Sequence, residues 1–594
     1  MHKGRKVFSA PTRFPPIAYS LFTWTLFFGF CAGTVSGFCA VWEEPLKEYT
    51  FMCGTSGGRL ILSSTNDPKS FNPIVAKETS TTQITGLLFE GLVTRDPLTL
   101  EILPRLAQKW KTADGKVWTF SLRRGVKWSD GKEFTADDVV FTFNDLIYNP
   151  DIPTSSRDIF TIEGEKIVVE KVDTYTVRFR LPSVFAPFLE SLAHEILPEH
   201  IYGPMVTSGT FTFSMGLDSN PSGIVGCGPF RLKKYLPGER VVLERNPFYW
   251  RKDSCGRSLP YLDEIIFVVL ANQDRALLKF MESEIDYYSL RPQDIAILGK
   301  MKTEGDFTIY NTGTSFTSDF VVLNQNPGTH PHTQKPFVLP YKLKWFQNVN
   351  FRKSISYAIN RKKIIDVVFQ GLAGPRYSCV SPANTLFYNP EITQYPYDPQ
   401  KARRLLGEMG FADRDQDGIL EDQEGHTLEM TFFTNNDSTE RIQIATLIKK
   451  DLEDIGMRIY FLPLNFNNLV TKLISSFDWE MILIGLTGGI EPHFGKNVWS
   501  YTGVLHMWNP TKTAVYEWEK EIEDIFNQGV RILDHTRRKK LYDRWQKIVS
   551  EELPVMYTVT GESIFAVKNR LGNVYPTVLG GAFPEIERVF IREE

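Results

Sequence analysis

The sequence predicts an α/β protein made of several domain-sized units. Segments with the alternating polarity of strands are interleaved with segments of helical spacing, and no internal repeat or low-complexity linker separates them. A chain of 594 residues corresponds to about four domains of typical size. The 42% hydrophobic and 23% charged residues are typical of a globular protein and exclude wholesale disorder.

The charge balance and the mean hydropathy exclude two classes of protein. The chain has 67 Lys and Arg against 70 Asp and Glu, a formal net charge of −3. A protein that binds nucleic acid needs a basic surface, so we expect no nucleic acid as a main partner. A mean hydropathy of −0.21 excludes a protein with many membrane spans.

Residues 1–40 have the features of an export signal or an N-terminal membrane anchor. Basic residues concentrate before residue 14, no charged residue occurs at 14–42, and small residues are frequent at 33–40. The uncharged stretch is also long enough to cross a bilayer uncleaved. The sequence therefore predicts export and leaves open whether the segment is cleaved or retained.

The cysteines leave lipid anchoring and disulfide pairing open. Cys31, Cys39 and Cys53 are candidates for a lipid anchor, although a bulky residue precedes each of them. Beyond the signal, three complete disulfide pairings are open to the four cysteines Cys53, Cys227, Cys255 and Cys379. An exported protein can form such bridges, but the low cysteine density indicates that they do not carry the fold.

Strand and helix signals follow one another in the first half of the mature region. Residues 59–63 and 117–123 alternate in polarity as strands do, whereas 81–92 has the apolar spacing of a helix. Thr135 and Asp138 have the spacing of a capping box, which predicts that a helix begins at Thr135.

A Gly/Ser/Pro-rich stretch at 208–228 indicates a crossing between domains. It precedes a predicted strand at 230–235, and a further strand is predicted at 427–433. The remaining segments are predicted to be helical: 350–368, 397–409, 439–455 and most of 515–550.

One acidic segment fits the spacing of a calcium-binding loop, D-x-D-x-D-G-x5-E. Its residues are Asp413, Asp415, Asp417, Gly418 and Glu424. Three carboxylates would converge on the cation, and the last glutamate would complete the site. A strand rather than a helix is predicted to follow, so an acidic, solvated turn is the alternative. If calcium binds, we expect it to be structural.

The short motifs that resemble catalytic sites have simpler structural explanations. Gly54–Gly58 fits GxSxG, but a strand follows it where a nucleophile elbow needs a helix. His194 and Glu195 begin like a zinc-protease motif, but Pro198 stands where the second ligand is needed. Four loop histidines are more simply polar surface groups than metal ligands: His330, His332, His493 and His506. We predict no catalytic residue and no required cofactor.

Four long blocks of the sequence carry a family resemblance. They are residues 87–143, which include "RRGVKWSDGKEFTADDVVFTF", 226–250 ("GCGPFRLKKYLPGERVVLERNPFYW"), 351–365 ("FRKSISYAINRKKII") and 397–411 ("YDPQKARRLLGEMGF"). In this order they resemble the extracellular solute-binding proteins of ABC importers, family five, which includes dipeptide, oligopeptide and nickel binders. The resemblance extends over roughly 58–590.

The resemblance implies a fold with two lobes, of the periplasmic-binding-protein type II with three domains. Two crossings would join the lobes, and a ligand would be enclosed between them. Carried over by order, the boundaries are 58–77, 224–311 and 555–594 for the first lobe, 78–223 for a domain inserted in it, and 312–554 for the second lobe.

The same resemblance implies where a ligand binds. The family's peptide binders carry an aspartate, after an aromatic-Gly segment, that pairs with the peptide amino group. Here Gly488, Gly489 and Ile490 stand at that place, and Glu491 is displaced. Either Glu491 replaces the aspartate, or the ligand is not an ordinary peptide. The expected cleft residues are Asn72, Glu78, Thr79, Ser80, Asn324, Asn326, Thr487, Glu491, His493, Asn497 and Trp499.

By this resemblance the chain is an exported, monomeric substrate-binding component of an ABC importer. It would act in the periplasm or at the outer face of the cytoplasmic membrane, where it delivers a small solute, peptide-like by preference, to a permease complex. Alternatives are a sensor, a binder of sugars, opines or metal chelates, and a secreted hydrolase that Ser56→Ala would inactivate.

Overall fold

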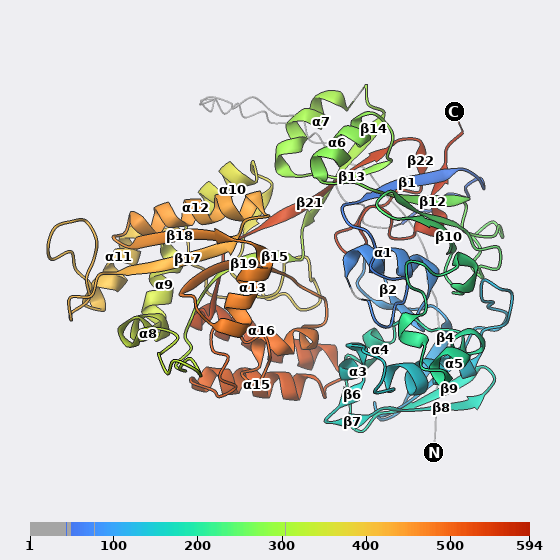
Figure 1. Ribbon diagram of the computed structural model, residues 1–594, viewed down its shortest axis with the longest axis horizontal. Helices are drawn as coiled ribbons and strands as arrows, with labels where there is room; N and C mark the ends of the chain where they lie inside the picture. Colours follow the sequence, from blue (N-terminus) through green and yellow to red (C-terminus); the bar gives the residue numbers. More distant parts are fainter. Residues whose placement is uncertain (1–42, 44–48, 77, 303, 594) are drawn as a thin grey trace, which may run out of the picture. The chain divides into compact units, whose positions relative to one another are not determined.

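The computed structural model describes residues 43, 49–76, 78–302 and 304–593, which belong to one compact unit (Figure 1). The predicted export segment, with Cys31 and Cys39, lies outside the described residues. Within the described part, no helix combines the length and the apolar character that crossing a bilayer requires.

The first lobe is organised around two sheets. One sheet has the order β1–β12–β11–β10, with β1 parallel to β12 and the other neighbours antiparallel. The second has the order β13–β21–β14, with β16 also paired to β21. The strands of these sheets from the first lobe are β1 (Arg59–Ser64), β10 (Phe230–Leu236), β11 (Arg240–Arg245), β12 (Glu264–Val269), β13 (Tyr287–Ser289), β14 (Phe307–Thr314) and β21 (Val559–Lys568). The strand β16 (Ala373–Pro375) comes from the second-lobe part of the chain and pairs with the start of β21. The associated helices are α1 (Thr79–Leu88), α6 (Gln273–Met281) and α7 (Ile295–Met301).

Between β1 and β10 the chain forms an inserted part with its own antiparallel sheet and apolar core. Its strands, in sheet order, are β4 (Ala107–Thr112), β5 (Val117–Leu122), β9 (Thr176–Arg180) and β8 (Val168–Asp173). Its main helices are α2 (Ala136–Phe141), which continues as the π-helix Thr142–Ile147, and α5 (Glu199–Thr207). Thr135 and Asp138 form the predicted capping box at the start of α2.

The second lobe has a five-stranded sheet with the order β18–β17–β19–β15–β20. Its strands are β15 (Thr317–Leu323), β17 (Glu429–Asn435), β18 (Arg458–Leu464), β19 (Met481–Thr487) and β20 (Val555–Tyr557). Because side chains alternate along a strand, β15 serves two cores: Val321 and Leu323 join one, and Phe320 and Val322 join the other.

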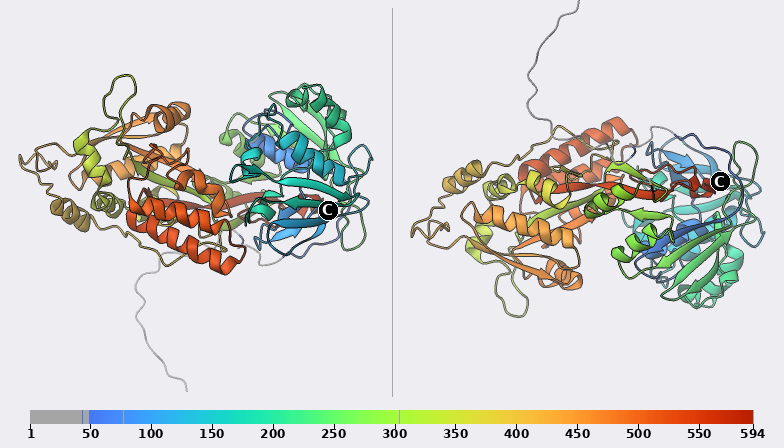
Figure 2. Two further views of the ribbon diagram at one scale, coloured as in Figure 1. Left: turned by 90° about the horizontal axis from the view of Figure 1, so that it is seen from below. Right: turned by 90° about the horizontal axis from the view of Figure 1, so that it is seen from above.

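Helices cover both faces of this sheet (Figures 1 and 2). One core contains residues of α8 (Pro340–Gln347), α9 (Val349–Ala358), α10 (Arg361–Val368), α11 (Pro399–Glu408) and α12 (Thr439–Glu453). The other contains residues of α13 (Phe466–Thr471), α14 (Lys496–Trp499), α15 (Glu517–Gly529) and α16 (His535–Glu552). Figure 2 shows α15 and α16 packed side by side.

Two short connections join the lobes. Residues 315–316 lead from β14 in the first lobe to β15 in the second, and residue 558 leads from β20 back to β21. The predicted α/β class with two lobes and two crossings is therefore confirmed. The predicted domain boundaries stay a prediction.

Three predicted helices differ in length from those observed. The segment 350–368 is divided into α9 and α10 because Asn360 caps a new helix through the Lys363 N–H. Asp534 likewise begins α16 and separates it from α15 within the predicted 515–550. The helix predicted at 81–92 ends at Leu88, because Phe89 has extended backbone angles.

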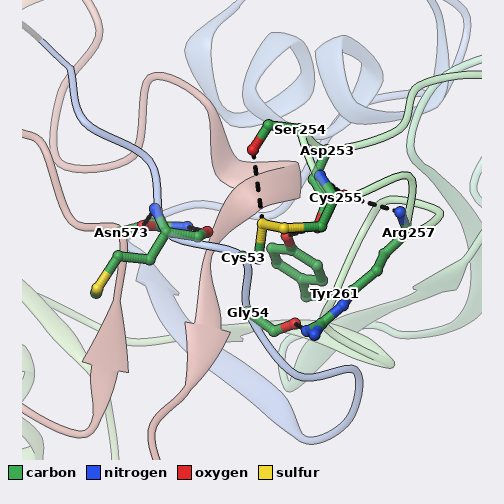
Figure 3. The surroundings of a disulfide bond; sticks show 9 residues. Cys53, Gly54, Asp253, Ser254, Cys255, Arg257, Tyr261 and Asn573 are labelled. Carbon is green, nitrogen blue, oxygen red and sulfur yellow. Dashed lines mark hydrogen bonds between the residues drawn. A yellow bond between two sulfur atoms is a disulfide. The ribbon is translucent and has the colours of Figure 1, made fainter.

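A disulfide between Cys53 and Cys255 ties the start of the described chain to the first lobe (Figure 3). Beside it, Tyr261 donates a hydrogen bond to Asp253, and Arg257 donates to the Gly54 carbonyl. Cys227 and Cys379 are free thiols. Because the Cys53 sulfur is in the bridge, Cys53 as a lipidation site was a wrong candidate.

Candidate functional site

The second lobe contains a cavity of about 440 Å³ beyond the carboxyl end of β19. The strand ends at Thr487 and is followed by Gly488 and Gly489, and the chain then turns into α14. This loop forms one wall, and residues 376–384 and the start of β15 form others. The volume lies in the range of small-molecule sites, which are mostly apolar with a few polar groups.

The structure brings only part of the predicted cleft set to this cavity. Thr487, Glu491, Asn497 and Trp499 line it, and His493 follows the lining residue Pro492. The other predicted residues are not part of its lining; they are Asn72, Glu78, Thr79, Ser80, Asn324 and Asn326.

The buried asparagines outside the cavity have structural partners. Asn324 donates at 2.9 Å to the carbonyls of Phe477 and Trp479, which fixes the chain at the end of β15. Asn326 accepts from a local backbone N–H, as Asn72 does in the first lobe. Their polar groups satisfy buried backbone, which is the usual use of a buried amide.

Glu491 forms a buried ion pair with Arg538 of α16. The side chains are 5% and 7% exposed, and Arg538 Nη1 lies 2.7 Å from Glu491 Oε2; a second bond joins Nη2 to Oε1. Glu491 also accepts the His493 backbone N–H at 3.0 Å. Burial alone would lower the pKa of Arg538, but the carboxylate raises it. The geometry therefore commits Glu491 to Arg538 rather than to a ligand ammonium.

Arg376 is a cavity residue that the sequence analysis missed. It is 3% exposed, and Nε donates to the Ser378 carbonyl at 2.9 Å. Its Nη1 donates to the Thr317 carbonyl and the Thr560 hydroxyl at 3.2 Å, and Nη2 donates to the Cys379 carbonyl at 3.3 Å. No carboxylate of the described chain forms an ion pair with it. Burial lowers the pKa of Arg376, and an arginine remains protonated at neutral pH.

Aromatic rings form much of the apolar wall. Trp499 and Trp545 pack edge to face, with ring centroids 5.2 Å apart, and both line the cavity. The Trp545 Nε1–H is buried and has no acceptor among the described residues. A buried donor without an acceptor is expensive and requires an explanation.

The lobes contact each other beside the cavity. Ile490, which lines it, packs with Leu100 of the inserted part and with Phe316 of a crossing. The His493 ring meets Phe185 edge to face at 5.5 Å. Burial, with nearby cations, lowers the pKa of His493 to about 3, so the ring is neutral at physiological pH and packs as an aromatic group.

A second cavity, of about 660 Å³, lies beside the crossings. Its arginine is already paired: Arg291 contacts Asp274 and Asp294, each at 2.8 Å. Asp319, in the same wall, lies 2.8 Å from Arg441. None of the predicted cleft residues lines this cavity.

The predicted calcium loop has three of its four predicted carboxylates together. Ligand atoms of Asp413, Asp415, Asp417 and Glu421 lie within 4.8 Å of one another. Glu424 points elsewhere and pairs with Lys344 at 3.5 Å. The strand expected after the loop runs from Glu429 to Asn435, so a strand rather than a helix follows the loop. The fourth carboxylate of the cluster is Glu421 rather than the predicted Glu424.

Calcium binding stays a prediction, now with a revised ligand set. We expect calcium to raise the Tm of the protein and a chelator to reverse the rise, because a cation that binds only the folded state stabilises it, by about 2.7 kcal/mol at 100 times Kd. Glu421→Gln should abolish the response, whereas the control Glu424→Gln should keep it. Thermal unfolding with and without calcium measures both. An equal loss in both variants would contradict the revised set.

Comparison with known proteins gives consistent likenesses over most of the chain. Residues 101–503 match the family model of bacterial extracellular solute-binding proteins, family 5 Middle. A probable ABC transporter-binding protein of Deinococcus radiodurans is 30% identical, with 88% of this chain and 90% of the relative covered. The dipeptide-binding protein of Escherichia coli is 28% identical, with 86% and 91% covered.

A solved structure supports the fold. The oligopeptide-binding protein AppA from Bacillus subtilis, in complex with a nonapeptide, superposes with a TM-score of 0.69 at 23% identity. The alignment covers 91% of this chain and all of that one.

Proposed function

Because the chain belongs to the bacterial extracellular solute-binding proteins of family 5 and is the substrate-binding component of an ABC transporter, we propose that it captures a small, peptide-like solute in the second-lobe cavity. The observation that supports this proposal most directly is the cavity, which is lined by the loop after β19 together with Arg376, Trp499 and Trp545. Relatives named for dipeptides and oligopeptides favour a peptide-like ligand.

Binding of this kind needs no covalent chemistry. The apolar wall supplies affinity by desolvation, and the few polar groups orient the solute. The contacts of Ile490 and His493 with Leu100 and Phe185 of the inserted part support a role for hinge closure at this cavity wall. The solute would then be delivered to a membrane permease on the outer side of the membrane.

The site can be tested by identifying what the purified protein carries. We expect mass spectrometry of the solute released on denaturation to show molecules the size of short peptides. Calorimetry with the same solutes should give binding that Trp499→Ala weakens, while Phe213→Ala, at an exposed residue of the first lobe, leaves it unchanged. A sugar or a metal chelate as the released solute would overturn the peptide-like class.

A further inference from the structure

The charges around the cavity are unbalanced. Four of its lining side chains can ionise: Arg376, Cys379, Glu491 and Tyr557. Burial raises the pKa of the Cys379 thiol and of the Tyr557 hydroxyl, so both are neutral at physiological pH. Glu491 is neutralised by Arg538 at 2.7 Å. The wall therefore carries one uncompensated positive charge, on Arg376.

An ammonium group would be poorly accommodated in this wall. It would approach Arg376 without a free carboxylate to offset the repulsion, since Glu491 is held by Arg538. Removing a charge from water without a partner is strongly unfavourable. Breaking the Glu491–Arg538 pair to provide a partner would leave Arg538 buried and unpaired instead.

Two N–H donors of cavity-lining residues have no acceptor in the described chain and could bind an acceptor group of the solute. Of the five N–H groups of Arg376, the described chain supplies acceptors for four, and one on Nη2 remains. Trp545, in the same lining, has its indole N–H without an acceptor. Arg352 and Arg361 are also tied to carbonyls, but neither lines this cavity. Position in the lining distinguishes Arg376 from an arginine with only a structural role.

We propose that the cavity binds a carboxylate and rejects a free ammonium, so that its solute is a short peptide-like acid whose amino end is blocked by an acyl group. Arg376 and Trp545 hold the carboxylate, and the apolar wall receives the rest. This specificity rests on the proposed function, because it concerns the same cavity and the same class of solute.

Four matched ligands test the effects of the ligand's carboxylate and of its ammonium group separately, in the unmodified protein. They are leucyl-leucine, its N-acetyl form, its C-terminal amide, and the form with both ends blocked. We expect the N-acetyl acid to bind tightest in calorimetry. Blocking the carboxylate or freeing the amine should each weaken binding by about 10–100-fold, the range for hydrogen bonds to charged groups.

Substitutions of Trp545 and Arg376 test whether these two side chains bind the carboxylate. Trp545→Phe removes the indole N–H and keeps an aromatic ring, so it should weaken binding of the N-acetyl acid about tenfold more than binding of the doubly blocked form. Trp479→Phe is the matched control, because Trp479 is also buried with an unpartnered indole N–H but lies outside the lining. Arg376→Gln should remove the preference for acid over amide, with circular dichroism to verify its fold.

The outcomes separate this inference from the proposed function. If leucyl-leucine binds as tightly as its N-acetyl form, the inference is overturned and peptide capture stands. If the acid and amide forms bind equally, the carboxylate site is overturned in the same way. If none of the four binds and the released solute is not peptide-like, the proposed function fails, and the inference fails with it.

Discussion

Replacement of Glu491 by glutamine is expected to lower the free energy of unfolding by about 3–5 kcal/mol. The substitution leaves the Arg538 guanidinium buried without its counter-charge, between Phe387 and Tyr542. Urea unfolding followed by tryptophan fluorescence measures the change. Several tryptophans pack in the core that α16 completes, so their signal reports on this lobe.

A matched pair gives the control. Glu163 and Arg531 also form an ion pair, but their side chains are 50% and 58% exposed, so Glu163→Gln should change the free energy of unfolding by at most about 1 kcal/mol. The double variant Glu491→Gln/Arg538→Met should recover much of the loss, because it removes both charges. Equal stability of Glu491→Gln and the unmodified protein would refute the structural role assigned to this pair.

Removal of the Cys53–Cys255 disulfide is expected to lower the free energy of unfolding by up to about 5 kcal/mol. The two residues are 202 positions apart, and the chain-entropy effect of a cross-link grows with the length of the loop that it closes. The double variant Cys53→Ser/Cys255→Ser should therefore unfold at lower urea concentration than the unmodified protein.

The reductant response supplies the control for this prediction. Reducing the unmodified protein should bring its urea midpoint to that of the double variant, and the variant itself should not respond. Cys227→Ser leaves the bridge intact and should keep the reductant response, because Cys227 is a free thiol. An unchanged midpoint after reduction would show that the bridge does not contribute to stability.

Local signals predicted the elements of secondary structure well, because they act within a few residues. The capping box at Thr135 and the alternation in β5 each depend on neighbours along the chain, and both are present. The splits at Asn360 and Asp534 also had local signals, since both residues favour helix N-caps. Apolar periodicity continued across them and obscured the breaks.

The candidate site was only partly predictable. The family resemblance led us to expect the loop after β19 in the ligand cleft, and Thr487, Asn497 and Trp499 of this loop line the cavity. Arg376 was missed because nothing in its neighbours marks it as a cavity residue. The fate of Glu491 was also hidden, because Arg538 is 47 positions away and approaches only when α16 packs on the sheet.

By itself, the sequence determined the α/β class, most helices and strands, and, through its long blocks, the family resemblance. These properties depend on short-range periodicity, on caps and on the order of many residues. The tertiary structure alone decided which carboxylates are free, which cysteines pair, which glutamate joins the acidic loop, and which cation remains uncompensated in the cavity. Those outcomes depend on distances of a few ångströms between segments far apart in the chain, and only packing sets such distances.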